Sequence, residues 1–321
     1  MKFLIFTITC GKITIMGHIF RESNFYKKYS LSAATLNEGD GFKIKTMADA
    51  FNTAGFRPGE LHTHDFYTVF WFVRGKGTHT VDFNVYDICA NTVIFLAPGQ
   101  IHAFNEPLGQ EGYIVEFSSG FISDERSQES VFLKYSSFYS ENPCHRISES
   151  DANFLQHLVD AMYEEKGRKG SFGHGIFLGM LVNLFLITLQ RTEPGVAGEV
   201  PDLASPSTRT FIRFRQALEN NFQKYHTVKD YARLLGVSTR SITACVSEHR
   251  HTTPLQMIND RIILEAKRLL KFSHLIIKEI SFSLGFEDPS YFVKFFKREV
   301  GVLPKEYRES RLNGGRIGMG R

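Results

Sequence analysis

The chain has 321 residues, of which 42% are hydrophobic and 22% charged, with a net charge of +4. This composition is ordinary for a soluble globular protein, and it excludes the disordered and fibrous classes. The length exceeds that of a usual single core and favours two domains.

Charge is divided unevenly along the chain. From Thr208 onward there are 21 Lys and Arg against 11 Asp and Glu, a net of +10, whereas the first 207 residues carry a net of −6. We therefore expect only the basic part to meet a polyanion such as a nucleic acid. The alternative explanation of this uneven charge is ordinary surface charge without a nucleic-acid partner, and the charge alone does not distinguish the two.

Cysteine spacing and hydropathy indicate the compartment. The four cysteines are far apart and include no C-x-x-C pair, which predicts neither a disulfide framework nor a structural zinc site. Residues 1–10 lack the small-residue cleavage site of a signal peptide. The most apolar stretch, 176–189, is shorter than the roughly 20 residues that span a bilayer. We expect a cytoplasmic protein that does not bind a membrane.

Short β-rich runs separated by turn residues extend from about Leu31 to Phe121. The expected strands are Tyr67–Val73, Thr78–Phe83, Thr92–Leu96 and Tyr113–Phe117, with turns at Gly75-Lys76-Gly77 and Pro98-Gly99. Many short strands without a helical pattern predict an antiparallel β-barrel or jelly roll. We place this barrel at residues 31–147, after an extension of uncertain structure at 1–30.

The hydrophobic spacing becomes helical after Ser150. Apolar residues between Phe154 and Met162 predict one helix, and 172–190 predict a second that is apolar almost all round. We assign residues 148–192 to a helical hairpin. The Pro- and Gly-containing segment 193–207 is an expected linker, followed by an all-α domain at 208–312 and a tail at 313–321.

One pattern occurs twice in the basic part. The segment from Val228 matches the segment from Ile277, so that Gly236 corresponds to Gly285 and, farther on, Pro254 to Pro304. In each copy an apolar helix ends at a glycine that can take positive φ, and a capped helix of about ten residues follows. Two such copies predict a double helix-turn-helix, joined by a long helix that begins at Pro254.

The second copy carries a specific resemblance. Residues 285–298, GFEDPSYFVKFFKR, and 301–308, GVLPKEYR, closely resemble the AraC/XylS family of bacterial regulators over about 100 residues. The resemblance implies a transcription regulator, a ligand-responsive activator, that binds double-stranded DNA and a small-molecule effector and contacts RNA polymerase. The residues themselves do not distinguish activation from repression.

The second helix of each unit is expected to enter a major groove. A joining helix of about 17 residues, roughly 25 Å long, would let one chain read a bipartite site. The side chains expected at the DNA are Arg240, Thr243, Ala244, Ser290, Tyr291, Lys294, Lys297 and Arg298. Arg240 suits a guanine edge and Ala244 a thymine methyl, whereas Lys297 and Arg298 suit phosphates. A solvated helix face is the alternative for each basic residue.

Residues 55–68, GFRPGELHTHDFYT, and 98–102, PGQIH, resemble the two cupin motifs over about 60 residues. In metal-binding cupins three histidines and a glutamate converge. His62, His64 and His102 keep the histidine positions, but Thr68 occupies that of the glutamate. The missing carboxylate favours a cluster without a metal, although three imidazoles can hold a divalent ion. We expect no cofactor.

An organic effector is the preferred occupant of the barrel. The residues expected to bind it are His62, His64, Tyr67, Trp71 and His102. Together with His79 they would offer aromatic walls with polar tips. The alternative for Trp71 is a purely structural position in the hydrophobic core.

Further alternatives concern the partner and the activity. The helical hairpin resembles the family's dimerisation element, which implies a homodimer with Leu158, Met162, Leu181, Leu184 and Phe185 at the seam; packing on the barrel is the alternative. A cupin metalloenzyme, an isomerase or dioxygenase with secondary DNA binding, is the second candidate function. A third is a constitutive DNA-binding protein with a barrel that only dimerises. No Ser-His-Asp order or H-E-x-x-H helix is apparent, so we expect no enzyme.

Overall fold

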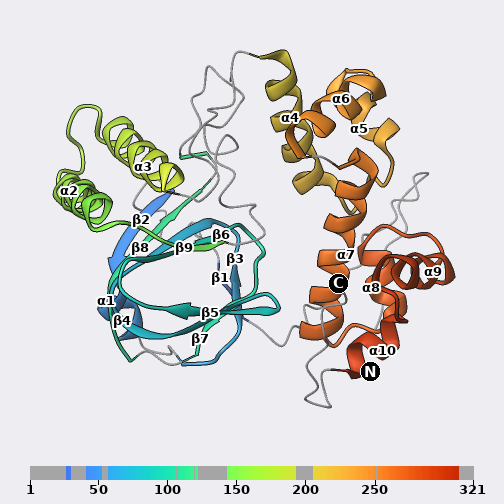
Figure 1. The fold of residues 1–321 in the computed structure, drawn as a ribbon, viewed down its shortest axis with the longest axis horizontal. Helices are drawn as coiled ribbons and strands as arrows, with labels where there is room; N and C mark the ends of the chain where they lie inside the picture. The colour runs from blue at the N-terminus through green and yellow to red at the C-terminus, as the bar shows by residue number, and fades with distance from the viewer. Residues whose placement is uncertain are drawn as a thin grey trace, which may run out of the picture.

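A computed structural model describes residues 27–29, 41–52, 57–105, 108–118, 120–121, 143–192, 205–250 and 252–310. A sheet-based half and a helical half lie side by side (Figure 1). Most of the expected extension and linker, and all of the tail at 313–321, lie outside the described residues.

The amino-terminal half is a curved sheet in which nearly every strand pair is antiparallel. Its strands are β1 (Lys27–Tyr29), β2 (Phe42–Thr46), β3 (His62–His64), β4 (Tyr67–Val81), β5 (Asn84–Ile88), β6 (Thr92–Leu96), β7 (His102–Phe104), β8 (Leu108–Phe117) and β9 (Cys144–Arg146). Only β1 and β3 pair in parallel among these strands. The first part of β4 pairs with β6 and β8, and its last part pairs with β5 and β7. Strand β4 thus belongs to both walls of the barrel, one formed with β6 and β8 and the other with β5 and β7. The predicted antiparallel barrel is confirmed.

The expected turn at residues 75–77 is wrong. The chain continues through it as one strand, and the register of β4 against β8 shifts on both sides of Arg74. Gly75 has φ +101°, and a Cβ there would lie 2.6 Å from the Cα of Gln110. Glycine at this point therefore serves a β-bulge that bends the strand. The hairpin turn follows β4, where Asp82 takes φ +52°.

Helices α2 (Glu149–Lys166) and α3 (His174–Arg191) pack on the outer face of this sheet. Alternation along β4 directs Val69 and Trp71 toward these helices, whereas Phe70 and Phe72 belong to a second cluster inside the barrel. A short helix, α1 (Met47–Phe51), is also present, although the sequence reading placed no helix in the strand region.

The expected dimer seam falls largely inside this core. Leu158, Met162 and Phe185 are 6%, 0% and 0% exposed and pack against the sheet of the same chain, as Leu181 partly does. Of the expected seam residues, Leu184 alone is exposed. The seam assignment is therefore corrected, because the hydrophobic pattern marks the face that covers the barrel.

Helix α3 is also the one described helix that is long and apolar enough to cross a membrane by length and composition. A core helix of a soluble protein passes the same test. Its buried face, which includes Leu178, Val182 and Leu189, packs on the sheet and α2.

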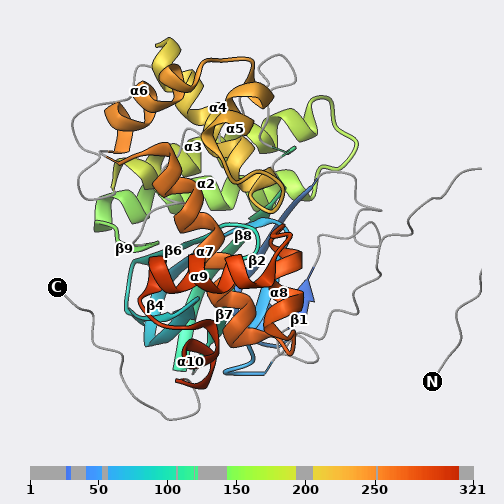
Figure 2. The ribbon, with the colours of Figure 1, turned by 90° about the vertical axis from the view of Figure 1, so that its right-hand side faces the viewer.

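The carboxy-terminal half is all helical. Its helices are α4 (Pro206–Asn221), α5 (Val228–Leu235), α6 (Thr239–Arg250), α7 (Pro254–Phe272), α8 (Ile277–Ser283), α9 (Pro289–Val300) and α10 (Pro304–Glu309). Helix α7 runs from the unit formed by α4–α6 to the unit formed by α8–α10 (Figure 2). The predicted double helix-turn-helix is confirmed, and α4 is an additional helix that begins inside the expected linker.

The turns and caps explain where these helices stop and start. Thr227 and Thr253 accept hydrogen bonds from backbone N–H groups of the first turns of α5 and α7. Gly285, after α8, has φ +83°, and a Cβ there would overlap the carbonyl oxygen of Gln223. The second turn thus requires glycine for both conformation and space.

Candidate nucleic-acid interface, histidine cluster and interdomain contact

Helix α6 presents one polar face to solvent. Ile242, Cys245 and Val246 are buried in the helical core, which fixes the rotation of the helix. The predicted DNA contacts Arg240, Thr243 and Ala244 are all exposed. Ser247 continues the same face one turn farther on and is exposed too; the sequence reading missed it, although the i, i+3 and i+4 spacing marks it.

Helix α9 repeats this arrangement. Its buried face consists of Phe292, Phe295 and Phe296. The predicted contacts on the other side, all exposed, are Ser290, Tyr291, Lys294, Lys297 and Arg298. The N-cap Asp288 accepts from the N–H of Ser290 at 2.8 Å and starts the helix next to these side chains.

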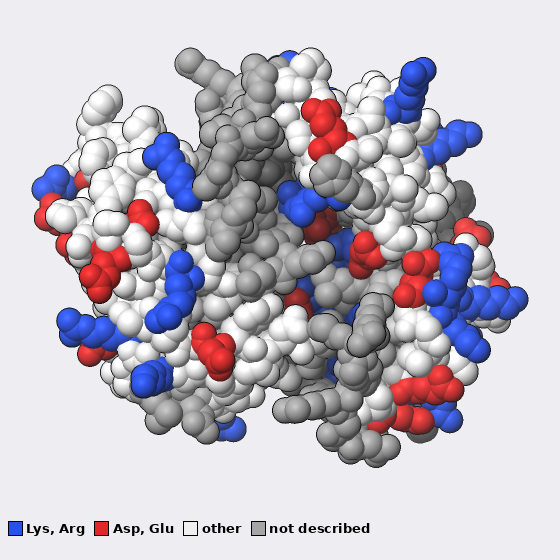
Figure 3. Space-filling view, viewed as in Figure 1, with Lys and Arg blue, Asp and Glu red and all other residues white. Residues whose placement is uncertain are grey.

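Ion pairing distinguishes the basic residues on these faces. Within the described ranges neither Arg240 nor Lys294 has an ion-pair partner, whereas Arg298 lies 2.7 Å from Glu299. A phosphate would have to compete with Glu299 for the Arg298 guanidinium. Lys and Arg side chains gather on the outer edge of the helical half, with acidic residues among them (Figure 3).

Inside the barrel, three imidazoles converge. One ring nitrogen from each of His62, His64 and His102 lies within 4.8 Å of the others. Each Nδ1 has a hydrogen-bond partner: the carbonyl of Glu60 at 3.0 Å for His62, Thr68 Oγ1 at 3.2 Å for His64, and His79 Nε2 at 3.2 Å for His102. The cupin-like motifs thus bring together the three histidines they predict.

Burial sets the protonation state of the cluster. It lowers the pKa of His79 to about 3 and holds the pKa values of His64 and His102 well below the ordinary range. These imidazoles are therefore neutral near pH 7. Aromatic rings complete the surroundings. Phe70 contacts both His79 and His102, and Phe104 contacts His79.

Three further interior residues lie at the cluster: His79, which was expected there, and Lys45 and Glu116, which were not. His79 is fully buried and bonded to His102. Lys45 and Glu116 form an ion pair of 2.7 Å, and both act electrostatically on His62. Glu116 pairs in register with Thr68 across β4 and β8, so the two side chains share the interior face. The alternation of side chains along a strand could have placed Lys45 and Glu116 inside the barrel. That inference also requires the register of β2 and β4 against β8, which the sequence does not give.

The structure separates Tyr67 and Trp71 from the histidines. Both belong to the cluster between the sheet and the helices α2 and α3, and Trp71 is 1% exposed. Thr68, with the opposite parity on β4, bonds to His64. The expectation that Tyr67 and Trp71 wall the same site as the histidines is thus corrected, because neighbouring residues of a strand face opposite sides.

A buried ion pair connects the two halves. Arg268 on α7 donates from Nε and Nη2 to the two carboxylate oxygens of Asp82, both at 2.8 Å. Burial alone would lower the pKa of Arg268, but the Asp82 carboxylate outweighs it and raises that pKa. Phe83, next to Asp82, stacks on Phe272 with ring centroids 5.7 Å apart. Neither contact was predicted, because its partners are nearly 190 residues apart in sequence.

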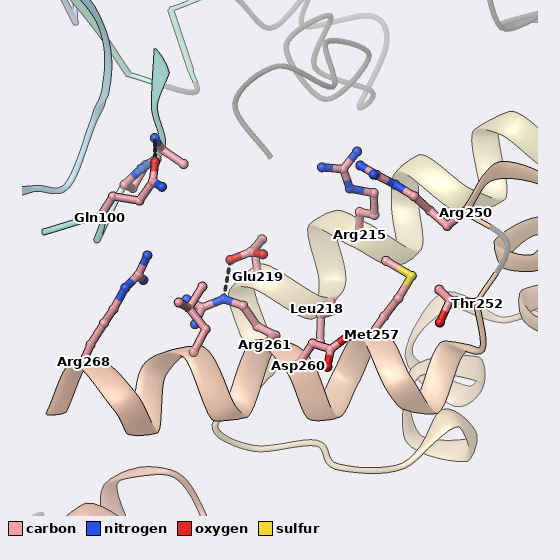
Figure 4. A pocket seen from close by; sticks show the side chains of 13 residues that line it. Gln100, Arg215, Leu218, Glu219, Arg250, Thr252, Met257, Asp260, Arg261 and Arg268 are labelled. Atoms are coloured by element: carbon pink, nitrogen blue, oxygen red, sulfur yellow. Dashed lines mark hydrogen bonds and ion pairs between the residues drawn. The ribbon is translucent and has the colours of Figure 1, made fainter. Parts of the chain in front are cut away.

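A cavity of about 480 Å³ lies beside this ion pair. Figure 4 shows Gln100 on the barrel side and Arg268, Arg261 and Asp260 on α7. Arg261 is held by Glu219 of α4 at 2.7 Å. The space-filling view shows the hollow between the halves, with Lys and Arg atoms in its walls (Figure 3).

Two family profiles match the chain. Residues 51–173 match the AraC-like ligand binding domain, and residues 231–310 match a helix-turn-helix domain. These matches fall on the barrel with its helical hairpin and on both helix-turn-helix units. The fold, the exposed second helices and the matches define a DNA-binding transcription regulator with an amino-terminal ligand-binding domain. The chain belongs to the AraC family, as its second repeat predicts.

The chain is similar over most of its length to proteins named as helix-turn-helix transcriptional activators. The chain is 25% identical to the transcriptional activator RhaR of Cronobacter sakazakii, over 77% of this chain and 86% of that one. It is 24% identical to the activator RhaS of an Enterobacter species, over 78% and 87%. Among solved structures, ToxT of Vibrio cholerae aligns with 16% identity and a TM-score of 0.36, covering 84% of this chain and 97% of that one.

Proposed function

We propose that this regulator is a ligand-responsive transcription activator that reads a bipartite DNA site through α6 and α9. Activation, which requires contact with RNA polymerase, is supported by the names of its relatives. The same relatives favour a regulator over the metalloenzyme alternative. The proposed base-reading residues are Arg240, Thr243, Ala244, Ser290, Tyr291 and Lys294, with Lys297 and Arg298 at phosphates.

The observation that carries the response to a ligand is the Asp82–Arg268 ion pair. It joins the barrel to α7, the helix that spans both helix-turn-helix units. On the barrel side, Asp82 also accepts from the N–H of Ile101 at 3.3 Å, and Ile101 precedes His102 of the cluster. A ligand at His62, His64 and His102 would therefore act next to the contact that positions α7.

A linkage of this kind needs a ligand with different affinity for two arrangements of the halves. An effector that binds the barrel more tightly when Asp82 and Arg268 are apart would release α7 from the barrel. DNA that binds the released form better would then bind the effector-loaded protein more tightly. By reciprocity, operator DNA would raise the affinity of the effector by the same factor.

The experiment is a selection of random duplex DNA by the full-length protein, followed by footprinting of the selected site. We expect two half-sites about one helical turn apart, on one face of the duplex. Binding without a shared motif would contradict the proposal. A metabolite screen on the selected site then tests the response, and an effector is expected to change the affinity of wild type but not of Asp82→Ala.

We also propose a homodimer that uses the outward face of the helical hairpin. Large apolar side chains are exposed there at helical spacing: Phe154, Ile176, Phe177, Met180 and Leu184. Several large apolar side chains exposed on one helical hairpin are a feature of protein interfaces. A second copy is the proposed occupant because the corresponding element of this family is implied to dimerise, and the opposite face of the hairpin is already buried on the barrel.

A further inference from the structure

The cavity between the two halves has one end where arginines gather. It follows α7 from Thr252, just before the helix, to Arg268 near its end, a distance of about 20 Å at the rise of an α-helix. Its volume is in the range of sites that hold small organic molecules. We propose that the end beside Thr252 binds the phosphate group of a small organic phosphate monoester through Arg215 and Arg250.

Two of the four arginines that line the cavity are held by carboxylates of the protein. Arg268 is bound by Asp82 at 2.8 Å, and Arg261 by Glu219 at 2.7 Å. A further carboxylate, that of Glu265, lies 3.1 Å from Arg261. The positive charge at this end is therefore balanced within the protein, and an added anion would have to displace a carboxylate there.

The other two arginines belong to the opposite end. Figure 4 shows the side chains of Arg215, on α4, and Arg250, on α6, directed toward the same part of the cavity, close to Thr252. Arg250 is exposed and forms no ion pair with any described residue. A guanidinium offers planar N–H donors that match two phosphate oxygens. Two such groups, with the Thr252 hydroxyl, suit a phosphate monoester, which carries a charge of about −1.5 to −2 near pH 7.

The wall between the two ends is largely apolar. Leu218 of α4 and Met257 and Leu264 of α7 line it, and Ala97 and Pro98 face it from the barrel. These side chains would contact the organic part of the ligand and exclude water from it. Inorganic phosphate would leave this wall without a partner, so the cavity favours an ester with a small apolar body.

The position of the cavity links binding to the contact between the halves. On the barrel side, Oε1 of Gln100 accepts from the N–H of Ala97 at 2.7 Å, which fixes the turn that forms this wall. A ligand that contacts both walls favours the arrangement in which the halves are joined. It would therefore oppose an effector in the barrel that favours separated halves. This regulatory consequence rests on the proposed function, but the binding itself does not.

The test is binding of phenyl phosphate to the full-length protein, measured by isothermal titration calorimetry at low salt, without DNA and in a phosphate-free buffer. We expect one bound molecule per chain and weaker binding of inorganic phosphate. Arg215→Gln and Arg250→Gln should each weaken binding at least about tenfold, because each loses hydrogen bonds between charged groups. Arg250→Lys keeps the charge without the planar donors, so its loss should be smaller than that of Arg250→Gln.

Phenol and benzoate separate the contributions of the ligand. Phenol lacks the charge and benzoate carries a single one, so both should bind at least about tenfold more weakly than phenyl phosphate. Phenol that binds as tightly would show that the arginines contribute nothing. Benzoate that binds as tightly would overturn the assignment to a phosphate.

The matched control is Arg209→Gln, which changes an exposed arginine of α4 outside the lining of the cavity and should bind like wild type. Folded wild-type protein that binds no phenyl phosphate at millimolar concentration would overturn the proposal. Arg215→Gln and Arg250→Gln that both bind like wild type would do the same, because the phosphate would then lie elsewhere on the basic half. If Arg215→Gln does not fold, the exposed Arg250 decides. Since neither DNA nor effector is present, failure of the proposed function leaves this result unchanged.

Discussion

Arg268 and Asp82 form a bidentate ion pair, with both contacts at 2.8 Å, although one lies on the helix between the DNA-binding units and the other on a hairpin of the barrel. A carboxylate and a guanidinium in this geometry form the stronger class of hydrogen bond. Removing one partner would leave the other charge without its counterion in a site that is 4% exposed on the arginine side.

Asp82→Ala is expected to release the barrel from the helical half. A buried charge without its partner costs about 3–5 kcal/mol, and separation of the halves avoids that cost by hydrating Arg268. Small-angle X-ray scattering should show a larger radius of gyration. Asp87→Ala, which changes an exposed carboxylate on the same hairpin, is the control, and an unchanged radius for Asp82→Ala would contradict the expectation.

Arg240→Ala and Lys294→Ala are expected to relax sequence preference at different half-sites. Each side chain is exposed on the outward face of its helix, so loss of a base contact should cost about 1–3 kcal/mol in DNA binding without unfolding the protein. Footprinting and repeated selection measure the effect. Lys305→Ala on α10 is the control; identical footprints and affinities for both variants would show that these helices do not read the DNA.

The two turn glycines should respond differently to alanine. Both have positive φ, but a Cβ at Gly236 would meet no atom within 4 Å, whereas one at Gly285 would overlap the Gln223 carbonyl. Gly236→Ala is expected to lower the free energy of unfolding by about 1–2 kcal/mol. Gly285→Ala adds the clash and should cost about 2–5 kcal/mol. Equal losses in urea titrations would argue against the tight packing of the second turn.

His226 should make the helical half sensitive to acid. Its Nε2 donates to the Leu284 carbonyl at 2.9 Å, and burial lowers its pKa, although this hydrogen bond and Asp230 partly oppose the shift. A pKa lowered by folding means that the unfolded state takes up the proton first. Stability is therefore full above pH 6.5 and is lost as the pH falls below it.

The measurement for His226 is the thermal midpoint of wild type and His226→Gln at about pH 7.5 and about pH 5.5. The buried histidines of the barrel lower the midpoint of both proteins in acid, so the difference between the two slopes isolates His226. A smaller decline is expected for the variant. Parallel declines would assign the acid sensitivity to the barrel alone.

The outward face of α3 should control association. Ile176 and Met180 are 68% and 65% exposed, one turn apart. Ile176→Asp together with Met180→Asp is expected to convert a dimer into a monomer in analytical ultracentrifugation, with little change in the thermal midpoint. Lys169→Asp, which changes an exposed charge in the connection between α2 and α3, is the control. A wild-type protein that is monomeric at high concentration would rule out this dimer.

Local signals predict the helical half well. The N-caps Thr227 and Thr253, the glycine turns and the apolar face of α9 all depend on residues within one or two turns of each other. The expected strand Thr92–Leu96 is found with the same bounds. Where the spacing of apolar residues alone determines whether a segment is a helix or a strand, the sequence is sufficient to predict it.

Long-range contacts could not be predicted in this way. The Gly75 bulge depends on how closely Gln110 approaches, and the dimer seam was misplaced because a hydrophobic stripe does not say which surface it covers. The histidine trio followed from its motif, but the roles of His79 and Glu116 depend on strand register. Asp82 and Arg268 carry no sequence signal of their partnership.

Strand β4 limits how this protein can vary in length. Its residues alternate between the core under α2 and α3 and the interior of the barrel, and its end leads into the hairpin at Asp82. Deletion of one residue after Thr68 would exchange the faces of Phe70 and Trp71 and shift the aspartate away from α7. Insertions and deletions among natural relatives should therefore avoid residues 67–82, and gaps in this strand would identify relatives that connect their halves in another way.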